Sequence, residues 1–121
     1  MLLPKLHLMS RVARDIDRCL DFVERQPWGK RDAREVDIYR GIAEVYAHPK
    51  RNRPEVYRPD NRVWLRRFRA AQFVIVYAFL QFEDPSLPDV VSIRAVRHVR
   101  AANVFHGVRE SPTKPSRGEV T

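Results

Sequence analysis

The sequence predicts a two-layer α+β fold, in which an N-terminal strand and a helical hairpin pack on one face of a mainly antiparallel sheet. Three observations lead to this prediction. Apolar residues recur every three or four positions in the first part of the chain, as on amphipathic helices. Later runs are rich in β-branched and aromatic residues and are separated by turn signals, as in strands. Helices followed by a strand meander are typical of helices covering one face of a sheet.

The chain is expected to begin with a short strand and an amphipathic helix. Residues Lys5–Met9 alternate apolar and polar side chains, which favours an edge strand. From Val12 onward the apolar positions have helical spacing, and they are Val12, Ala13, Ile16, Cys19, Leu20 and Val23. Pro27 ends this helix, because proline cannot continue the helical hydrogen bonding.

A second helix is predicted over Asp32–Ala47. Its apolar stripe comprises Val36, Tyr39, Ile42, Ala43 and Tyr46. His48–Pro49 stops it, and the few residues between the two helices make them an antiparallel hairpin. Residues 50–61 contain two prolines and many polar groups, so we expect a loop there.

Three strands are predicted to complete the fold. Val63–Ala70 mixes apolar and arginine positions and should be half exposed, whereas Phe73–Leu80 is apolar throughout and belongs in the centre of a sheet. A tight turn near Ala71–Gln72 joins these two strands. Val90–Arg100 is the last strand, and residues 101–108 are expected to form a closing helical turn.

The length and composition suit one domain, expected over residues 1–110, with residues 111–121 a disordered tail. The longest apolar run, Phe73–Leu80, is far shorter than the roughly 20 residues of a membrane-spanning helix. The N-terminus lacks the cationic start of a signal peptide, so we expect a cytoplasmic protein with no membrane contact. One cysteine excludes an internal disulfide, and the four histidines have no metal-ligand spacing. We expect no metal and no cofactor.

The charge balance points to polyanionic or acidic partners. The formal net charge is +8, and eight basic residues lie between Lys50 and Arg69, opposed only by Glu55 and Asp60. Aromatic rings are interleaved with them, a combination that suits nucleic acid or an acidic protein. The residues expected to bind a partner or nucleic acid are Arg53, Tyr57, Arg62, Arg66, Arg67 and Arg69. The alternative is a solvated strand face whose arginine stems cover the edge of the core.

The last strand carries the best candidates for chemistry. Residues two apart in a strand share a face, so Arg94, His98 and Arg100 are expected to point the same way. Histidine can move a proton near neutral pH and arginine can stabilise a phosphate, as RNA cleavage requires. The alternative is that His98 is a structural hydrogen-bonding group at the end of the strand.

Five segments, in this order, resemble the RelE/ParE toxin superfamily. They are Arg11–Ile16, His48–Pro49 with Arg53–Pro54, Val63–Arg66, Val74–Tyr77 and Ile93–Arg100. The first resembles the family's opening helix, and the last resembles its closing strand with histidine and arginine at the end. Asn52 stands where the family usually has glycine. The resemblance covers about residues 5–106, and no single motif in it is sharp.

The resemblance implies a toxin of a type II toxin–antitoxin system, of the kind associated with plasmid stabilisation and growth inhibition. The ParE branch, which inhibits DNA gyrase by protein contact, is favoured by the helical hairpin and the His-Arg ending. The alternative is a RelE-like endonuclease that cuts mRNA on the ribosome; against it, Phe105 occupies the region where many RelE members carry a tyrosine. A cognate antitoxin forming a hetero-oligomer is implied in either case. An inactive remnant or an RNA- or protein-binding module of similar fold is the further alternative.

Overall fold

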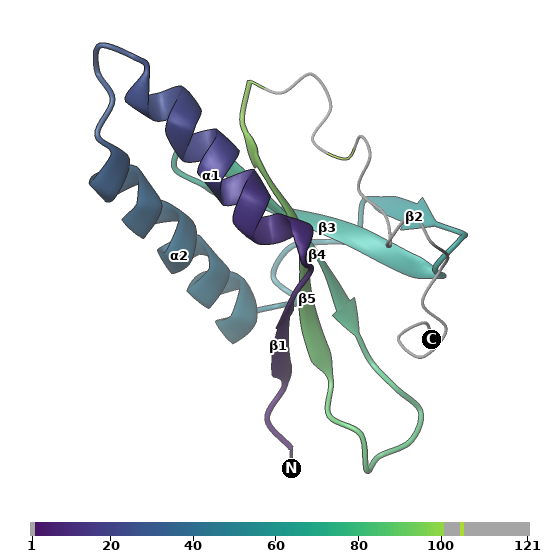
Figure 1. Cartoon of the computed structure of the whole chain (residues 1–121). Helices are drawn as coiled ribbons and strands as arrows, with labels where there is room; N and C mark the ends of the chain where they lie inside the picture. The colour runs from purple at the N-terminus through teal and green to yellow at the C-terminus, as the bar shows by residue number, and fades with distance from the viewer. Residues whose placement is uncertain (1, 101–104, 106–121) are drawn as a thin grey trace.

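The computed structural model describes residues 2–100 and 105, and it has the predicted two-layer α+β architecture (Figure 1). In chain order the elements are β1 (Lys5–Leu8), α1 (Arg11–Glu24), α2 (Arg31–Ala47), β2 (Val56–Arg58), β3 (Val63–Ala70), β4 (Phe73–Leu80) and β5 (Val90–His98). The two helices form the predicted hairpin, and the strands form one mixed sheet.

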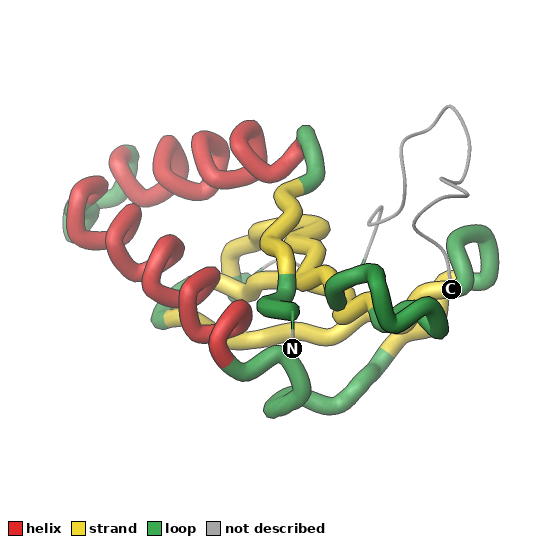
Figure 2. Tube along the Cα trace, turned by 90° about the horizontal axis from the view of Figure 1, so that it is seen from below, coloured by secondary structure: helices red, strands yellow, loops and turns green. Residues whose placement is uncertain are grey.

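The sheet has the strand order β1-β5-β4-β3-β2. The pair β1–β5 is parallel, and every other pair is antiparallel. Both helices lie on the same side of the sheet (Figure 2). Helix α1 packs mainly against β5, and α2 packs against β3 and β4. The β2 end of the sheet therefore lies away from α1.

The sheet separates two hydrophobic clusters. On the helix side, α1 and α2 pack against Phe73, Ile75, Tyr77 and neighbouring side chains. The opposite side gathers the alternate residues of the same strands around Phe105. Strand β4 contributes to both clusters, so nearly all its side chains are buried. This explains why its sequence is apolar without alternation.

Helix α1 has the predicted register. Five of the six residues expected on its apolar stripe are buried, namely Val12, Ile16, Cys19, Leu20 and Val23. Ala13 is the exception and is exposed. The helix ends at Glu24, just before Pro27. Gly29 follows in the hairpin, where an added Cβ would collide with the backbone carbonyl of Val23.

The predicted apolar stripe of α2 was largely wrong. The buried residues are Ile38, Gly41, Ile42 and Val45, whereas Val36 and Tyr39 are exposed. The reason is Gly41, which faces the sheet. A Cβ added there would lie 2.6 Å from Ala70 Cβ and 2.7 Å from Ile75 Cδ1. The missing side chain lets the helix approach closely, and this contact fixes which side of α2 is buried.

Two boundaries also differ from the predictions. The segment expected to be a loop contains the short strand β2, which pairs with β3. The last strand ends at His98, and Arg100 lies in the turn that follows. The helical turn expected over residues 101–108 and the tail expected over 111–121 lie outside the described residues, apart from Phe105, which is buried.

No helix in the described part of the chain combines the length and apolar character needed to cross a membrane.

Candidate functional site

The arginines of β3 point to both faces of the sheet. Val63 and Leu65 belong to the cluster opposite the helices, and Ala70 belongs to the helix-side cluster. Because side chains alternate along a strand, Arg66 faces the helix side whereas Arg67 faces the opposite side. The residues predicted to form one basic surface are therefore divided between two.

The helix-side face of the sheet carries an exposed pair of aromatic side chains on the same face as Arg66 of β3. Tyr57 of β2 and Trp64 of β3 are directly opposed in the antiparallel register. Their ring centroids are 5.1 Å apart, and the rings are inclined by 50°. Tyr57 is 43% exposed and Trp64 is 52% exposed, although both project from strands. Helix α2 packs against the other end of β3, at Ala70, so this end of the face is left uncovered.

Arg66 helps to fix the loop next to the aromatic pair. Its guanidinium donates to the backbone carbonyl of Asn52 at 2.7 Å. The Asn52 amide donates to the hydroxyl of Tyr77 at 3.3 Å, and that hydroxyl donates to the carbonyl of Pro49 at 3.0 Å. Tyr77 is thus a buried core residue that anchors the loop, in line with its place in the central strand. These hydrogen bonds hold the loop before β2 at Pro49 and Asn52. The next residue of the loop, Arg53, is exposed to solvent.

On the opposite face, the arginines contact the protein itself. Arg67 Nε lies 2.9 Å from the Glu55 carboxylate, and its guanidinium lies 5.9 Å from the centre of the Phe105 ring. Arg69 donates to the carbonyl of Ala71 at 2.9 Å. Both side chains nevertheless remain exposed to solvent. Arg62 is exposed at the turn between β2 and β3, with a φ of 55°.

We call the exposed residues Arg53, Tyr57 and Trp64, together with the partly buried Arg66, the aromatic–arginine surface. Trp64 was missed as a site residue by sequence reasoning. Trp64 lies between the aliphatic residues Val63 and Leu65 in the sequence. If those two residues are buried on one face of the strand, alternation places the Trp64 ring on the other face. The side chains suit a protein contact, because Trp, Tyr and Arg contribute most of the binding energy at protein interfaces.

The alternation that was expected to align the three candidates on the last strand is interrupted in the structure. The pairing of β4 with β5 runs from Phe73–His98 to Val76–Ala95 and then skips to Tyr77–Ile93. Arg94 is the extra residue of a β-bulge, which shifts the alternation by one. It is also 1% exposed. Arg94 and His98 are thus separated by the bulge, and Arg100 lies beyond the strand.

His98 is packed between aromatic rings. Its ring centroid lies 5.0 Å from that of Phe22 and 5.9 Å from that of Phe73, with edge-to-face geometry. Nδ1 accepts a hydrogen bond from the backbone N–H of Arg100 at 3.2 Å. Burial, and then the charge of Arg100, lower the pKa of His98. Each of these features favours the neutral imidazole and a structural role.

Among the described residues, no group of three or more His, Cys, Asp and Glu side chains is arranged to hold a metal ion. No protein-family model matches the chain, and no curated protein matches it.

Proposed function

We propose that the chain is the toxin of a type II toxin–antitoxin pair, a ParE-like growth inhibitor that acts on DNA gyrase by protein contact. The observation that carries this proposal is the aromatic–arginine surface. Exposed Tyr57 and Trp64 rings are large, rigid contact groups, and the anchored Arg66 beside them lies next to a loop that is already ordered. A preordered surface loses little conformational entropy on binding.

The strand end supports a protein poison over a ribonuclease. A ribonuclease needs an acid–base group and cations that converge on one phosphate. Here Arg94 is buried at the bulge, and the Nδ1 of His98 already accepts a hydrogen bond. The RelE-like alternative therefore lacks the convergence that its candidate residues require. The toxin resemblance of the five sequence segments supplies the functional class, and the cytoplasm, where gyrase acts, is the proposed location.

The proposed antitoxin can occupy a sheet edge that no described strand covers. Strand β1 is the outermost strand next to β5. The backbone N–H groups of Lys5 and Met9 donate to β5, at 2.8 Å to Asp89 and 3.0 Å to Ile93. In a parallel pair alternate residues bond the same neighbour, so the backbone groups of Leu6 and Leu8 point away from the sheet. Their side chains are exposed too. We propose that an antitoxin segment adds a strand here.

The experiment that tests the proposal is a controlled pulse of expression in bacteria, followed in parallel for induction of the DNA-damage response and for cleavage of translated mRNA. DNA damage with intact messages is expected. Purified gyrase should also lose supercoiling activity when the protein is added. Codon-phased mRNA cuts without early DNA damage would replace the proposal by the ribonuclease, and an absence of toxicity would leave a binding module or an inactive remnant.

The surface itself is tested by the double variant Tyr57→Ala with Trp64→Ala. Loss of two interface aromatics should weaken gyrase inhibition by about 30-fold or more. The matched control is Trp28→Ala in the helical hairpin, because Trp28 is 48% exposed and thus similar in type and exposure to Trp64. Equal inhibition by the double variant and the wild type would remove the aromatic–arginine surface from the proposal.

A further inference from the structure

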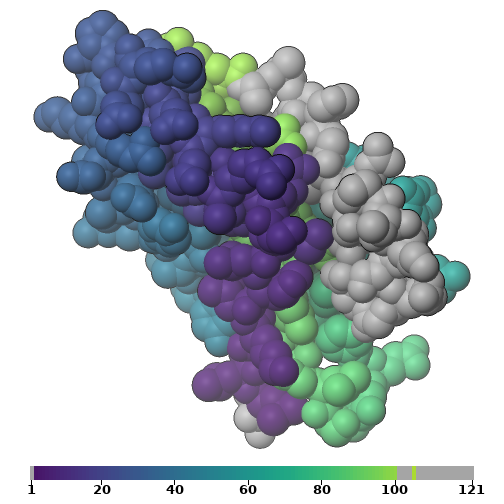
Figure 3. Space-filling model, viewed as in Figure 1, coloured from purple at the N-terminus to yellow at the C-terminus, as the bar shows by residue number. Residues whose placement is uncertain are grey.

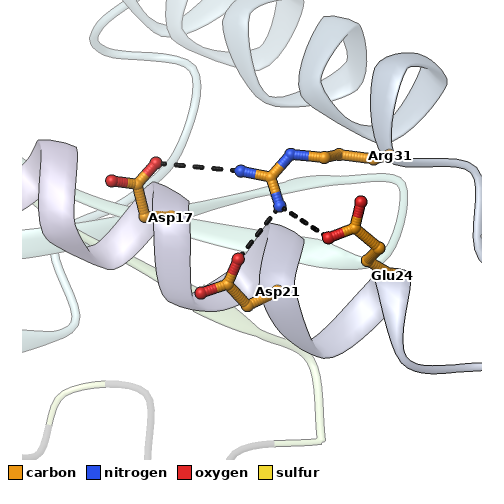
Figure 4. A network of polar contacts seen from close by, with 4 residues as sticks. All are labelled: Asp17, Asp21, Glu24 and Arg31. Carbon is orange, nitrogen blue, oxygen red and sulfur yellow. Dashed lines mark hydrogen bonds and ion pairs between the residues drawn. The ribbon is translucent and has the colours of Figure 1, made fainter.

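Helix α1 carries acidic and basic side chains along adjacent sides, and the acidic side contacts Arg31 of α2. Asp17, Asp21 and Glu24 follow one another at spacings of four and three residues and therefore share a side. Arg31, at the start of α2, reaches all three carboxylates, at 4.0, 3.0 and 3.5 Å (Figure 4). The side chain hydrogen bond to Asp21 is the largest cause of the raised pKa of Arg31. The acidic side of α1 thus contacts the start of α2 through Arg31.

The basic side consists of Arg11, Arg14, Arg18 and Arg25, which we call the arginine ridge. At 3.6 residues per turn, these positions lie within about 60° of one another around the helix axis. Arg14, Arg18 and Arg25 are exposed. No hydrogen bond or ion pair of their side chains occurs in the structure of the described residues. Figure 3 shows the outer side of α1, in dark purple, at the molecular surface.

The buried carboxylate next to the ridge, that of Asp15, is already engaged. Asp15 is buried, and its carboxylate lies 3.3 Å from Arg11 Nε while also accepting the backbone N–H of Val96 at 3.1 Å. It faces the sheet rather than the outer arginines.

Arg97 of β5 has a pKa that is lowered by burial first and then by the charge of Arg11, whereas the charge of Asp15 raises it. Like charges three and four residues apart destabilise an isolated helix by a few tenths of a kcal/mol per pair, roughly. An arrangement that concentrates such charges on one side is matched best by an external polyanion.

We propose that the arginine ridge binds the phosphodiester backbone of a nucleic acid. From Arg11 to Arg25 the ridge extends about 21 Å along the helix, at about 1.5 Å per residue. One strand of a duplex carries a phosphate about every 3.4 Å of its axis, so a row of phosphates matches the ridge in length as well as charge. Arginine forks bind phosphate oxygens bidentately.

The contact is with the backbone and not with the bases. The single aromatic residue of α1, Phe22, is packed against His98 and does not present a ring on the ridge. Without exposed rings there is no stacking platform for unpaired bases. The ridge therefore recognises the charge and the spacing of the phosphate groups, and its binding should be independent of nucleotide sequence. The inference does not rest on the proposed gyrase contact, because it concerns other residues and another ligand.

The test is fluorescence anisotropy with the purified full chain, on a 20-base-pair duplex DNA and a 20-nucleotide single-stranded RNA, at several salt concentrations from about 50 to 200 mM. The variant is Arg14→Gln with Arg18→Gln and Arg25→Gln. The control is Lys5→Gln with Lys30→Gln and Arg40→Gln, which removes the same charge from other exposed positions. Thermal unfolding of each variant verifies that it is folded.

The ridge variant should bind at least about tenfold more weakly at low salt, and its slope of log affinity against log salt should fall by about 2 to 3 for duplex DNA. The control should keep most of the wild-type affinity and slope. A preference for DNA or for RNA identifies the source of the backbone. Equal weakening by both variants would mean that net charge alone attracts nucleic acid, and that result, or no binding by the wild type at low salt, overturns the proposal. The two proposals can fail separately. A ridge variant that no longer binds nucleic acid but still inhibits growth would show that growth inhibition does not depend on the ridge.

Discussion

Asp15 on α1 accepts a hydrogen bond from the backbone N–H of Val96 on β5, at 3.1 Å. Strand β1 pairs with β5 only as far as Ile93, so beyond that point no strand of residues 2–100 lies along this edge of β5. Helix α1 supplies the missing partners, since the Cys19 thiol also lies 3.7 Å from the carbonyl of Val96. A helix thus takes over the hydrogen bonding of a sheet edge where the strand stops.

Asp15→Ala should destabilise the fold by about 2–3 kcal/mol, because it leaves a buried N–H without its acceptor and removes one partner of Arg11. Chemical denaturation measures this change. Asp17→Ala, which breaks an exposed pair with Arg31, is the control and should cost less than about 1 kcal/mol. If the two variants are equally stable, the bond to Val96 does not hold the edge.

Gly41→Ala should destabilise the protein, although alanine is the better helix former by about 1 kcal/mol. The added methyl would lie 2.6 Å from Ala70 Cβ, and such overpacking costs typically about 1–3 kcal/mol. Ala43→Gly, at an exposed position of the same helix, should show the ordinary propensity cost alone. Combining Gly41→Ala with Ala70→Gly should give a favourable coupling energy in a double-mutant cycle. Stabilisation by Gly41→Ala alone would contradict the close approach.

Acid should weaken the fold through His98. Burial and the charge of Arg100 lower the pKa of His98 in the folded protein below its ordinary value of 6.5. At acidic pH the unfolded chain therefore binds a proton at His98 more readily than the folded protein does. The stability contributed by neutral His98 is therefore present above that pH and lost as the pH falls through the lowered folded pKa. The measurement is the unfolding free energy at pH 7.5 and at more acidic pH.

His98→Phe keeps a ring against Phe22 and Phe73 but cannot titrate, so its stability should fall less on acidification than that of the wild type. Arg100→Gln should remove only part of the fall, since burial is the larger cause. A fall of the same size in His98→Phe and the wild type would assign the effect to other groups.

Cys19 should react slowly with thiol reagents while the protein is folded. Burial, followed by the charge of Asp15, raises the pKa of the thiol to about 12, so little thiolate is present at pH 8. Alkylation by iodoacetamide, followed by mass spectrometry, should be slow in buffer and fast in denaturant. Rapid modification of the native protein would show that α1 opens frequently from the edge of β5.

The sequence predicted which segments form helices and strands better than it predicted which side of each one is buried. The stripe of α1 was identified because its remaining side is almost wholly charged, so only one side can be buried. On α2 the apolar residues are compatible with two different buried sides of the helix. The choice between them depends on Gly41, whose role becomes visible only when its neighbour Ala70 in the folded protein is known. Strand β2 is three residues long and too short to show a period.

The candidate site shows the same division. Composition located the basic cluster, but treating it as one surface ignored the alternation of β3, which separates Arg66 from Arg67. The bulge at Arg94 left no signal, because the residues around it are buried on both faces of β5. Alternation therefore failed there for a physical reason: both sides of that strand are buried.

The strand order also sets the distance between the two surfaces proposed here. The arginine ridge lies beside β5, and the aromatic pair lies on β2 and β3, toward the other edge of the sheet. With strands about 4.8 Å apart, β5 and β2 are separated by roughly 14 Å. If both proposals hold, a protein with contact surfaces so placed would be bivalent toward a target that is itself bound to DNA. The second contact then forms at a high effective concentration, so avidity exceeds either affinity and disappears when either surface is lost.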